Sequence, residues 1–437
     1  MKATVIGGGL AGCEAAWQLA NRGVEVTLYE MKSHQMNPAQ TLPTMAELVC
    51  SNSLRSDRLS NAVGLLKEEM RRLRSLILQV ADATRVPAGG ALAVDREGFS
   101  RAVDAAIRSH EHITVVEQEV TQIPEGDVII ATGPLTSDAL SDAILKLDGL
   151  STLHFYDAAA PIVTADSLDR DKVFEMSRYD RGSDYLNCPM DEAEYMTFVQ
   201  ALKSAETVPV KGFEEKSVFE GCMPIESMAK RGDMAIAFGP LKPVGLNDPR
   251  TGKMPFAVVQ LRRDNFSGSL YNIVGFQTRL TFPEQRRVFG LIPGLAQAEF
   301  ARYGVMHRNT FLASPGFLDE TYRVKSRPNL YFAGQMTGVE GYVESAASGL
   351  MAGLSLAYRL QDQQPPAFSG KTAIGAMGRY IATPNRNFQP MNCAFGLIDP
   401  YDYAPGQKKI RNKQERYERI SERALAEIDA IARQMER

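Results

Sequence analysis

Length, composition and charge describe an ordinary globular protein. The chain has 437 residues, of which 44% are hydrophobic and 23% charged, and its formal net charge is −3. A chain of this size buries ample apolar surface and should fold as about two or three domains. The balanced charge excludes a generally basic polyanion-binding protein, so contact with nucleic acid would need a local patch. No apolar run approaches the roughly 18 residues that span a bilayer, and the N-terminus is a core strand and not a signal peptide. We therefore expect no membrane segment and a cytoplasmic location.

The first thirty residues predict a dinucleotide-binding strand, turn, helix and second strand. A short apolar run ends at Ile6, a helical pattern covers about 10–20, and the next apolar strand ends at Glu30. The turn between them has G-x-G-x-x-G spacing, and the residues expected around a pyrophosphate are Gly7, Gly8, Gly9, Leu10, Ala11 and Gly12. Glycine allows the tight turn and close approach, the helix N-terminus attracts phosphate, and Glu30 can accept hydrogen bonds from a ribose. The spacing alone leaves NAD and FAD both open.

Two later segments favour FAD. A strand over 127–131 runs into ATGP, which contains Gly133, and a strand after Pro328 runs into FAGQMTGVEGY, which contains Gly334 and Gly341. A helix is expected from about 343 to 360. FAD is long, and its ribityl and flavin parts need a second helix N-terminus in addition to the first.

The predicted fold class is α/β. We expect a Rossmann-type FAD-binding domain, of the two-dinucleotide-binding flavoprotein type, with an inserted α+β substrate domain. The expected divisions are 1–150 for the first part of the FAD-binding domain, 151–326 for the insertion, and 327–437 for the second part. The last of these carries a C-terminal helical tail that we expect to contact RNA.

Two basic stretches have competing interpretations. Residues 62–80 have helical spacing, and we interpret their basic side chains as a solvated helix face rather than an RNA contact: Lys67, Arg71, Arg72 and Arg74. In the tail, the densest basic cluster precedes the charged terminal helix and is interpreted equally well as solvated or as RNA-contacting: Lys408, Lys409, Arg411 and Lys413.

Cysteines are the candidates for chemistry. The five of them, Cys13, Cys50, Cys188, Cys222 and Cys393, stand far apart, which excludes C-x-x-C metal knuckles and disfavours a disulfide framework. Cys222 lies in a turn beside Gly221 and Pro224, and Cys50 lies in the polar loop over the expected cofactor cleft, so either one suits a nucleophile. Tyr342, at the start of the second flavin-facing helix, is placed to approach the ring system. The histidines have no metal-ligand spacing, and we expect no metal site.

With these segments in view, the chain resembles TrmFO, the bacterial family of folate- and FAD-dependent tRNA (uracil-5-)-methyltransferases, over nearly its whole length. The resemblance is carried by GGGLAG, ELVCSNSLRSD, YDAAAPIV, VFEGCMPIE, LKPVGLNDPRTGK, VGFQTRLTFPEQ, YFAGQMTGVEGYVESAASG and NFQPMN. The GidA/MnmG flavoproteins, which modify the tRNA wobble uridine, share the flavin motifs.

The resemblance implies the reaction and its partners. It implies that 5,10-methylenetetrahydrofolate supplies a carbon, reduced FAD supplies electrons, and NADH or NADPH recharges the flavin. The product is 5-methyluridine in the T-arm of tRNA. Cys222 adds to uracil C6, Cys50 assists as a second thiol or proton acceptor, and Tyr342 lies near the flavin. We expect a monomer or weak dimer.

Other functions remain open at this point. The same catalyst could act on a ribosomal RNA uridine, or the chain could be a flavin-bearing RNA-binding or RNA-chaperone module. A generic NAD(P)H oxidase is the plainest option, but it gives no reason for the two loop cysteines.

Overall fold

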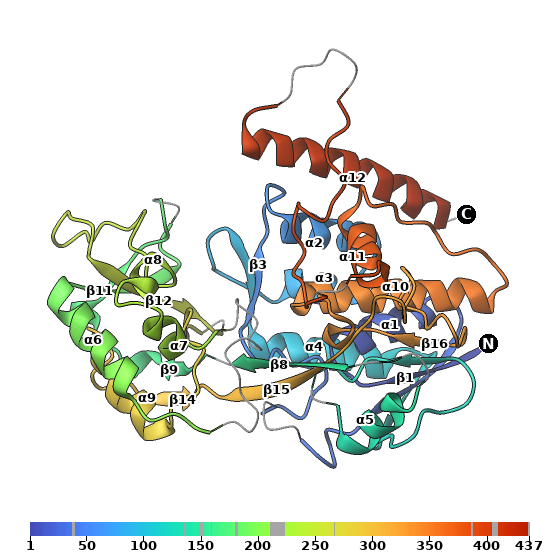
Figure 1. Ribbon diagram of the computed structural model, residues 1–437, viewed down its shortest axis with the longest axis horizontal. Coiled ribbons are helices and arrows are strands. Elements are labelled where there is room, and N and C mark those ends of the chain that lie inside the picture. The colour runs from blue at the N-terminus through green and yellow to red at the C-terminus, as the bar shows by residue number, and fades with distance from the viewer. Residues whose placement is uncertain are drawn as a thin grey trace.

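The computed structural model (Figure 1) describes residues 1–36, 40–134, 136–147, 150, 152–158, 160–179, 182–209, 223–265, 267–385, 388–403 and 410–435. For 152–158 and 306–310 only the backbone is described.

A five-stranded parallel sheet forms the centre of the larger unit. Its strand order is β16-β7-β1-β2-β6, with bounds Leu330–Phe332, Val128–Ile130, Lys2–Ile6, Glu25–Glu30 and Ile113–Glu117. Val5 pairs with Leu28 on one side and Ile129 on the other. Strands of a parallel sheet are covered on both faces, and the three apolar residues of β7 are accordingly all buried. The turns after β1, β7 and β16 therefore meet at one edge of the sheet. This is the predicted Rossmann-type α/β arrangement.

Two helices that follow these turns pack unusually closely. Helix α1 covers Leu10–Ala20 and α10 covers Tyr342–Leu360, and the two contact each other along their length (Figure 1). A Cβ atom on Gly349 would lie 2.1 Å from the Ala11 carbonyl oxygen, and one on Gly353 would lie 2.7 Å from the Ala15 carbonyl oxygen. Glycine at both positions lets the helix backbones touch, which sets the distance between the two predicted cofactor-facing turns.

The helix predicted over 62–80 is broken into two. Helix α2 covers Ala62–Arg72 and α3 covers Leu76–Ala83. Between them Arg74 has a φ of 60°, and the Ser75 side chain accepts a hydrogen bond from the Leu78 N–H. The left-handed residue ends the first helix, and the N-cap serine starts the second. Apolar periodicity does not detect this change of direction.

Other helices complete the larger unit. They are α4 (Arg96–Ser109), α5 (Asp138–Leu145), α11 (Ala373–Ala382) and the terminal α12 (Lys413–Met435), which lies across α2 (Figure 1). The terminal helix was predicted, and its apolar stripe is buried through Ile420, Ala424, Leu425, Ile428 and Ile431. A small antiparallel sheet has the order β3-β5-β4, with bounds Ser53–Ser56, Ala91–Val94 and Arg85–Val86.

The chain between the two Rossmann segments forms a second unit with its own core. Its six-stranded antiparallel sheet has the order β10-β11-β12-β13-β9-β14, with bounds Phe174–Glu175, Tyr185–Met190, Ala257–Arg263, Leu270–Ile273, Ile162–Thr164 and Phe300–Arg302. Helices α6 (Glu192–Ser204), α7 (Ile225–Lys230), α8 (Ala235–Phe238) and α9 (Phe282–Phe289) accompany it. Helix α6 begins with a capping box formed by Asp191 and Glu194.

A two-stranded ribbon joins the two units. It pairs β8 (Thr152–Ala158) with β15 (Met306–Leu312) in antiparallel register, and it crosses between the units in Figure 1. Within the described ranges, no helix has the length and apolar character needed to cross a membrane.

Candidate active site

A deep pocket opens at the sheet edge where the three turns meet. The space between its walls, including open solvent at the entrance, is about 1090 Å³. Eight of the sequence-predicted residues line it: Gly7, Gly9, Leu10, Ala11, Glu30, Gly133, Gly334 and Tyr342. Segments far apart in the sequence therefore contribute to one site.

Gly8, Gly12 and Gly341 are not among the lining residues and have local roles. A Cβ on Gly12 would lie 1.8 Å from the Gly7 carbonyl oxygen, so this glycine lets α1 lie against the strand. A Cβ on Gly8 would lie 2.8 Å from Glu30 Oε2. Gly341 has a φ of 117° and precedes the first residue of α10.

The first glycine-rich turn leaves space for a phosphate group next to the N-terminus of α1. A Cβ on Gly9 would meet no atom within 4 Å, so the space beside this glycine is open. Gly9 is the N-cap of α1 and makes no side-chain cap, and the first turn of α1 carries no acidic residue. The N–H groups and the positive end of the helix dipole therefore face the pocket and suit an anion.

Glu30 is held in place at the end of β2. Its Oε2 accepts a hydrogen bond from the Gly8 N–H at 2.6 Å, and its Oε1 accepts one from the Lys32 N–H at 2.9 Å. A carboxylate fixed in this way retains acceptor capacity for ribose hydroxyls. The residues around the pocket fit a dinucleotide.

Sequence reasoning missed part of the pocket wall. Met31, Gln40, Glu47 and Val49 line it from the loop after β2, and 118–120 line it from the end of β6. Glu47 forms a buried ion pair with Lys32 at 3.0 Å. Because the loop is polar and aperiodic, its sequence did not show which of its side chains face the pocket. The ELVCSNS motif indicated only that the loop is important.

Cys50 and Tyr342 meet beside the pocket. The Tyr342 hydroxyl oxygen accepts hydrogen bonds from the Cys50 N–H at 2.6 Å and from the Ser51 N–H at 3.3 Å. Burial raises the pKa of the Tyr342 phenol, and the nearby Cys50 adds to the rise. The phenol therefore stays neutral at physiological pH and orients the half-buried Cys50 turn.

Cys222 lies outside the described residues, as do Lys408 and Lys409. The described chain resumes at Met223, and Pro224 precedes α7. This start is tied to the VGFQTRL segment, because the Ile225 N–H donates to the Gln277 carbonyl oxygen at 2.8 Å. The meeting of Cys222 with Cys50 stays a prediction.

The other three cysteines are structural. Cys13, Cys188 and Cys393 are buried. Burial raises the pKa of each thiol, to about 12 for Cys188. Thiols held neutral in this way are poor nucleophiles.

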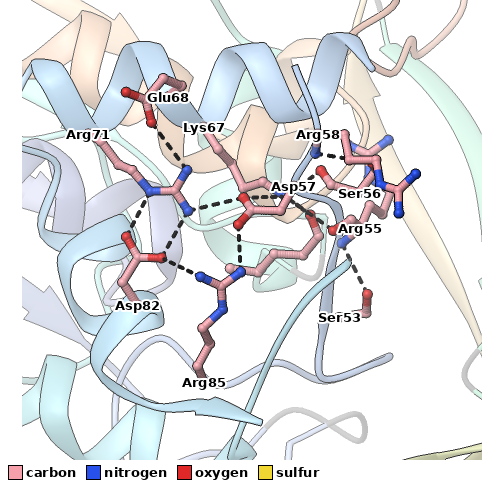
Figure 2. Close-up of polar contacts among 11 residues, drawn as sticks. Ser53, Arg55, Ser56, Asp57, Arg58, Lys67, Glu68, Arg71, Asp82 and Arg85 are labelled. Carbon is pink, nitrogen blue, oxygen red and sulfur yellow. Dashed lines mark hydrogen bonds and ion pairs between the residues drawn. The ribbon is translucent and has the colours of Figure 1, made fainter. Parts of the chain in front are cut away.

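An ion-pair network anchors β3, the strand that follows Cys50 (Figure 2). Lys67 donates to the carbonyl oxygens of Leu54 at 2.8 Å, Arg55 at 3.1 Å and Ser56 at 2.7 Å. Asp57 pairs with Arg71 at 3.0 Å, and also with Arg85 on β4. The network fixes the path of the chain just after the candidate cysteine.

The prediction that the basic side chains of 62–80 form a solvated helix face is therefore wrong for Lys67, which lies on α2. Its side chain is fully buried and donates hydrogen bonds to three backbone carbonyl groups of β3. Arg72 pairs with Glu68 and with Asp429 of α12. These basic side chains hold the fold together, which a count of charges on a helix does not reveal.

Comparison with known proteins identifies relatives along the whole chain. Residues 2–364 match the family model described as Glucose inhibited division protein A. Proteins named methylenetetrahydrofolate--tRNA-(uracil-5-)-methyltransferase TrmFO are similar at full length. The one from Lactobacillus delbrueckii is 59% identical over 435 residues, covering 98% of each chain. The one from Bacillus licheniformis is 60% identical over 431 residues, also covering 98% of each.

Among solved structures, GidA from Aquifex aeolicus has the same fold. The superposition has a TM-score of 0.71 at 15% sequence identity and covers 99% of this chain and 73% of that one. A second crystal form of the same protein gives a TM-score of 0.70. The chain therefore belongs to the TrmFO family, within the broader Glucose inhibited division protein A family.

Proposed function

We propose that this protein is a methylenetetrahydrofolate- and FAD-dependent methyltransferase that converts the T-loop uridine of tRNA to 5-methyluridine. The observation that carries the proposal is a pocket lined by the glycine-rich turns beside the hydrogen-bonded Cys50 and Tyr342, in a chain 59% identical to a protein named for this reaction. We expect a cytoplasmic enzyme that is a monomer or weak dimer.

The pocket residues divide between the two ends of FAD. The Gly7–Gly12 turn and the N-terminus of α1 would hold the pyrophosphate, and Glu30 would hold the adenosine ribose. Gly133, Gly334 and the α10 N-terminus would lie along the flavin side. When bound, FAD supplies the electrons that complete the methyl group, with carbon from methylenetetrahydrofolate and reducing equivalents from NADH or NADPH.

The protein's own contribution is thiol chemistry on the base. Uracil C5 is a poor nucleophile until a thiolate adds at C6, and we assign that addition to Cys222. Cys50 accepts the proton that C5 later loses, and Tyr342 orients the Cys50 backbone. Because a T-loop uridine is stacked in the folded tRNA, it must turn outward to reach the thiols. We assign RNA contact to the 151–326 unit and to the C-terminal tail.

Mass spectrometry of nucleosides tests the proposal. An unmodified tRNA transcript is incubated with the protein, methylenetetrahydrofolate and NADPH. We expect 5-methyluridine only when both are present, and its loss in Cys222→Ser. Cys188→Ser is the matched control, because this cysteine is buried in the separate core around the six-stranded antiparallel sheet, and it should keep activity. Activity with S-adenosylmethionine alone would overturn the proposal.

Two other outcomes would redirect the assignment. Methylation of a ribosomal RNA uridine instead of tRNA would keep the chemistry and change the substrate. Full function of Cys222→Ser in cells that lack the gene would favour an RNA-binding or RNA-chaperone role.

A further inference from the structure

The Cys50 turn is held from two sides by buried arginines, one from each unit. Arg96 is the first residue of α4 in the Rossmann unit, and Arg262 lies on β12 in the other unit. Their exposed fractions are 8% and 7%. Neither was predicted from the sequence.

Arg96 fixes the N-terminal side of the turn. It donates a hydrogen bond to the Leu48 carbonyl oxygen. Its Nε and Nη2 donate to the two carboxylate oxygens of Asp264 at 3.0 and 2.9 Å. Asp264 directly follows β12 and is 2% exposed. A two-pronged buried ion pair therefore joins the two units at this point.

Arg262 fixes the C-terminal side. Its Nη2 donates to Ser51 Oγ at 2.6 Å, and its Nε donates to Asn52 Oδ1 at 3.1 Å. The Asn52 amide in turn donates to the Val94 and Arg263 carbonyl oxygens, each at 2.9 Å. The residues on either side of Cys50 thus have fixed partners in both units.

Arginine side chains contribute positive charge around the turn. Arg302, at the end of β14, interacts electrostatically with Cys50, Tyr342, Arg96 and Glu47. Burial lowers the pKa of Arg302, and repulsion from Arg96 lowers it further. Among the described residues, Asp264 interacts with Arg96 and Arg262, and Glu47 interacts with Arg302.

Each of the two carboxylates is shared between more than one described cation. Glu47 is already paired with Lys32, and Asp264 is engaged by Arg96. Two phenols also lie nearby: Tyr342 beside Cys50 and Tyr185 beside Arg262. A thiol next to cations favours its anionic form, so we expect these arginines to favour a thiolate at Cys50.

We propose that Arg96 and Arg262 are positioning residues that clamp the Cys50 turn between the two units and keep its thiol deprotonated. Docking of the 151–326 unit then completes a proton acceptor at the pocket. In the reaction proposed above, on which this use rests, the C5–H bond of the uracil breaks and an S–H bond forms on Cys50. The bonding electron pair stays with the ring.

Alkylation kinetics test the clamp without RNA or folate. In the FAD-loaded Cys222→Ser protein, Cys50 is the reactive thiol, because the other three cysteines are buried with raised pKa values. Its rate of reaction with iodoacetamide is followed against pH by peptide mass spectrometry. We expect half-maximal reaction below the pH of about 8.5 typical of a free cysteine.

Two clamp variants and one control complete the experiment. Arg262→Gln and Arg96→Gln should each raise the midpoint of the alkylation profile by about one pH unit, which corresponds to a tenfold change in the proton affinity of the thiol. Arg263→Gln is the matched control, because successive strand residues point to opposite faces, and it should leave the profile unchanged. Arg262→Lys keeps the charge, so it should give an intermediate midpoint and serves if Arg262→Gln does not fold.

The proposal is overturned if Cys50 titrates like a free cysteine, or if the Arg262 variants match the Arg263 control. A thiolate at Cys50 combined with failure of the nucleoside assay would count against the proposed function alone.

Discussion

Substituting two glycines of the first turn separates folding from cofactor binding. In Gly9→Ala the new methyl group meets no protein atom within 4 Å, and φ is −77° with extended ψ, which any residue adopts. Because an N-cap glycine is replaced by a poorer cap, we expect a loss of stability below about 1 kcal/mol. The methyl group enters the space assigned to the pyrophosphate, so FAD affinity should fall at least about tenfold, or about 1.4 kcal/mol.

Gly12→Ala should behave in the opposite way. Its methyl group would lie 1.8 Å from the Gly7 carbonyl oxygen and 3.0 Å from the Gly7 carbonyl carbon. The helix must move away from the strand by more than a bond length, and overpacking of this kind costs about 1–3 kcal/mol or more.

Thermal unfolding of the apoproteins and titration with FAD measure the two effects separately. The expected pattern is a stable Gly9→Ala protein that binds FAD weakly and an unstable Gly12→Ala protein. Wild-type FAD affinity in Gly9→Ala would refute the placement of the pyrophosphate at this turn.

Three further variants test the buried charges. Lys67→Met leaves three carbonyl groups and Asp57 without their ammonium partner, so urea unfolding should show a loss of about 3–5 kcal/mol. Burial raises the pKa of Glu69 to about 8 from 4.5; the folded state then holds an extra proton between these values, so stability falls as pH rises through that window. Glu69→Gln should abolish this fall, and an identical pH slope in both proteins would contradict the assignment. Arg55→Met leaves the buried Glu344 carboxylate without its cation, so the free energy of unfolding should fall by about 3 kcal/mol. The double variant Arg55→Met/Glu344→Gln should recover most of this loss.

Local patterns were sufficient for the Rossmann elements. Glycine spacing, short apolar strands and helical periodicity are set by neighbouring residues, so β1, α1, β2, β16 and α10 were all expected near their observed bounds. The break at Arg74 was not expected, because residues on both sides of it have apolar faces and only the packing of α3 reveals the change of direction.

Charge placement was predicted less well than helix placement. The sequence shows that Lys67 is basic and lies on a helix, but its burial depends on carbonyl groups of β3 that arrive from a separate turn. Glu47 on the pocket wall is a similar case, since its partner Lys32 lies 15 residues away in an aperiodic loop.

By itself, the sequence determined that the chain has two glycine-rich, helix-initiating turns suited to a dinucleotide and that Cys50 lies in a polar motif. Only the tertiary structure decided that Cys50 meets Tyr342, 292 residues away, and that Arg96 and Arg262 hold its turn from opposite sides. The physical reason is that backbone conformation follows from local sterics and hydrogen bonding, whereas the state of a thiol depends on charges that converge from separate parts of the chain.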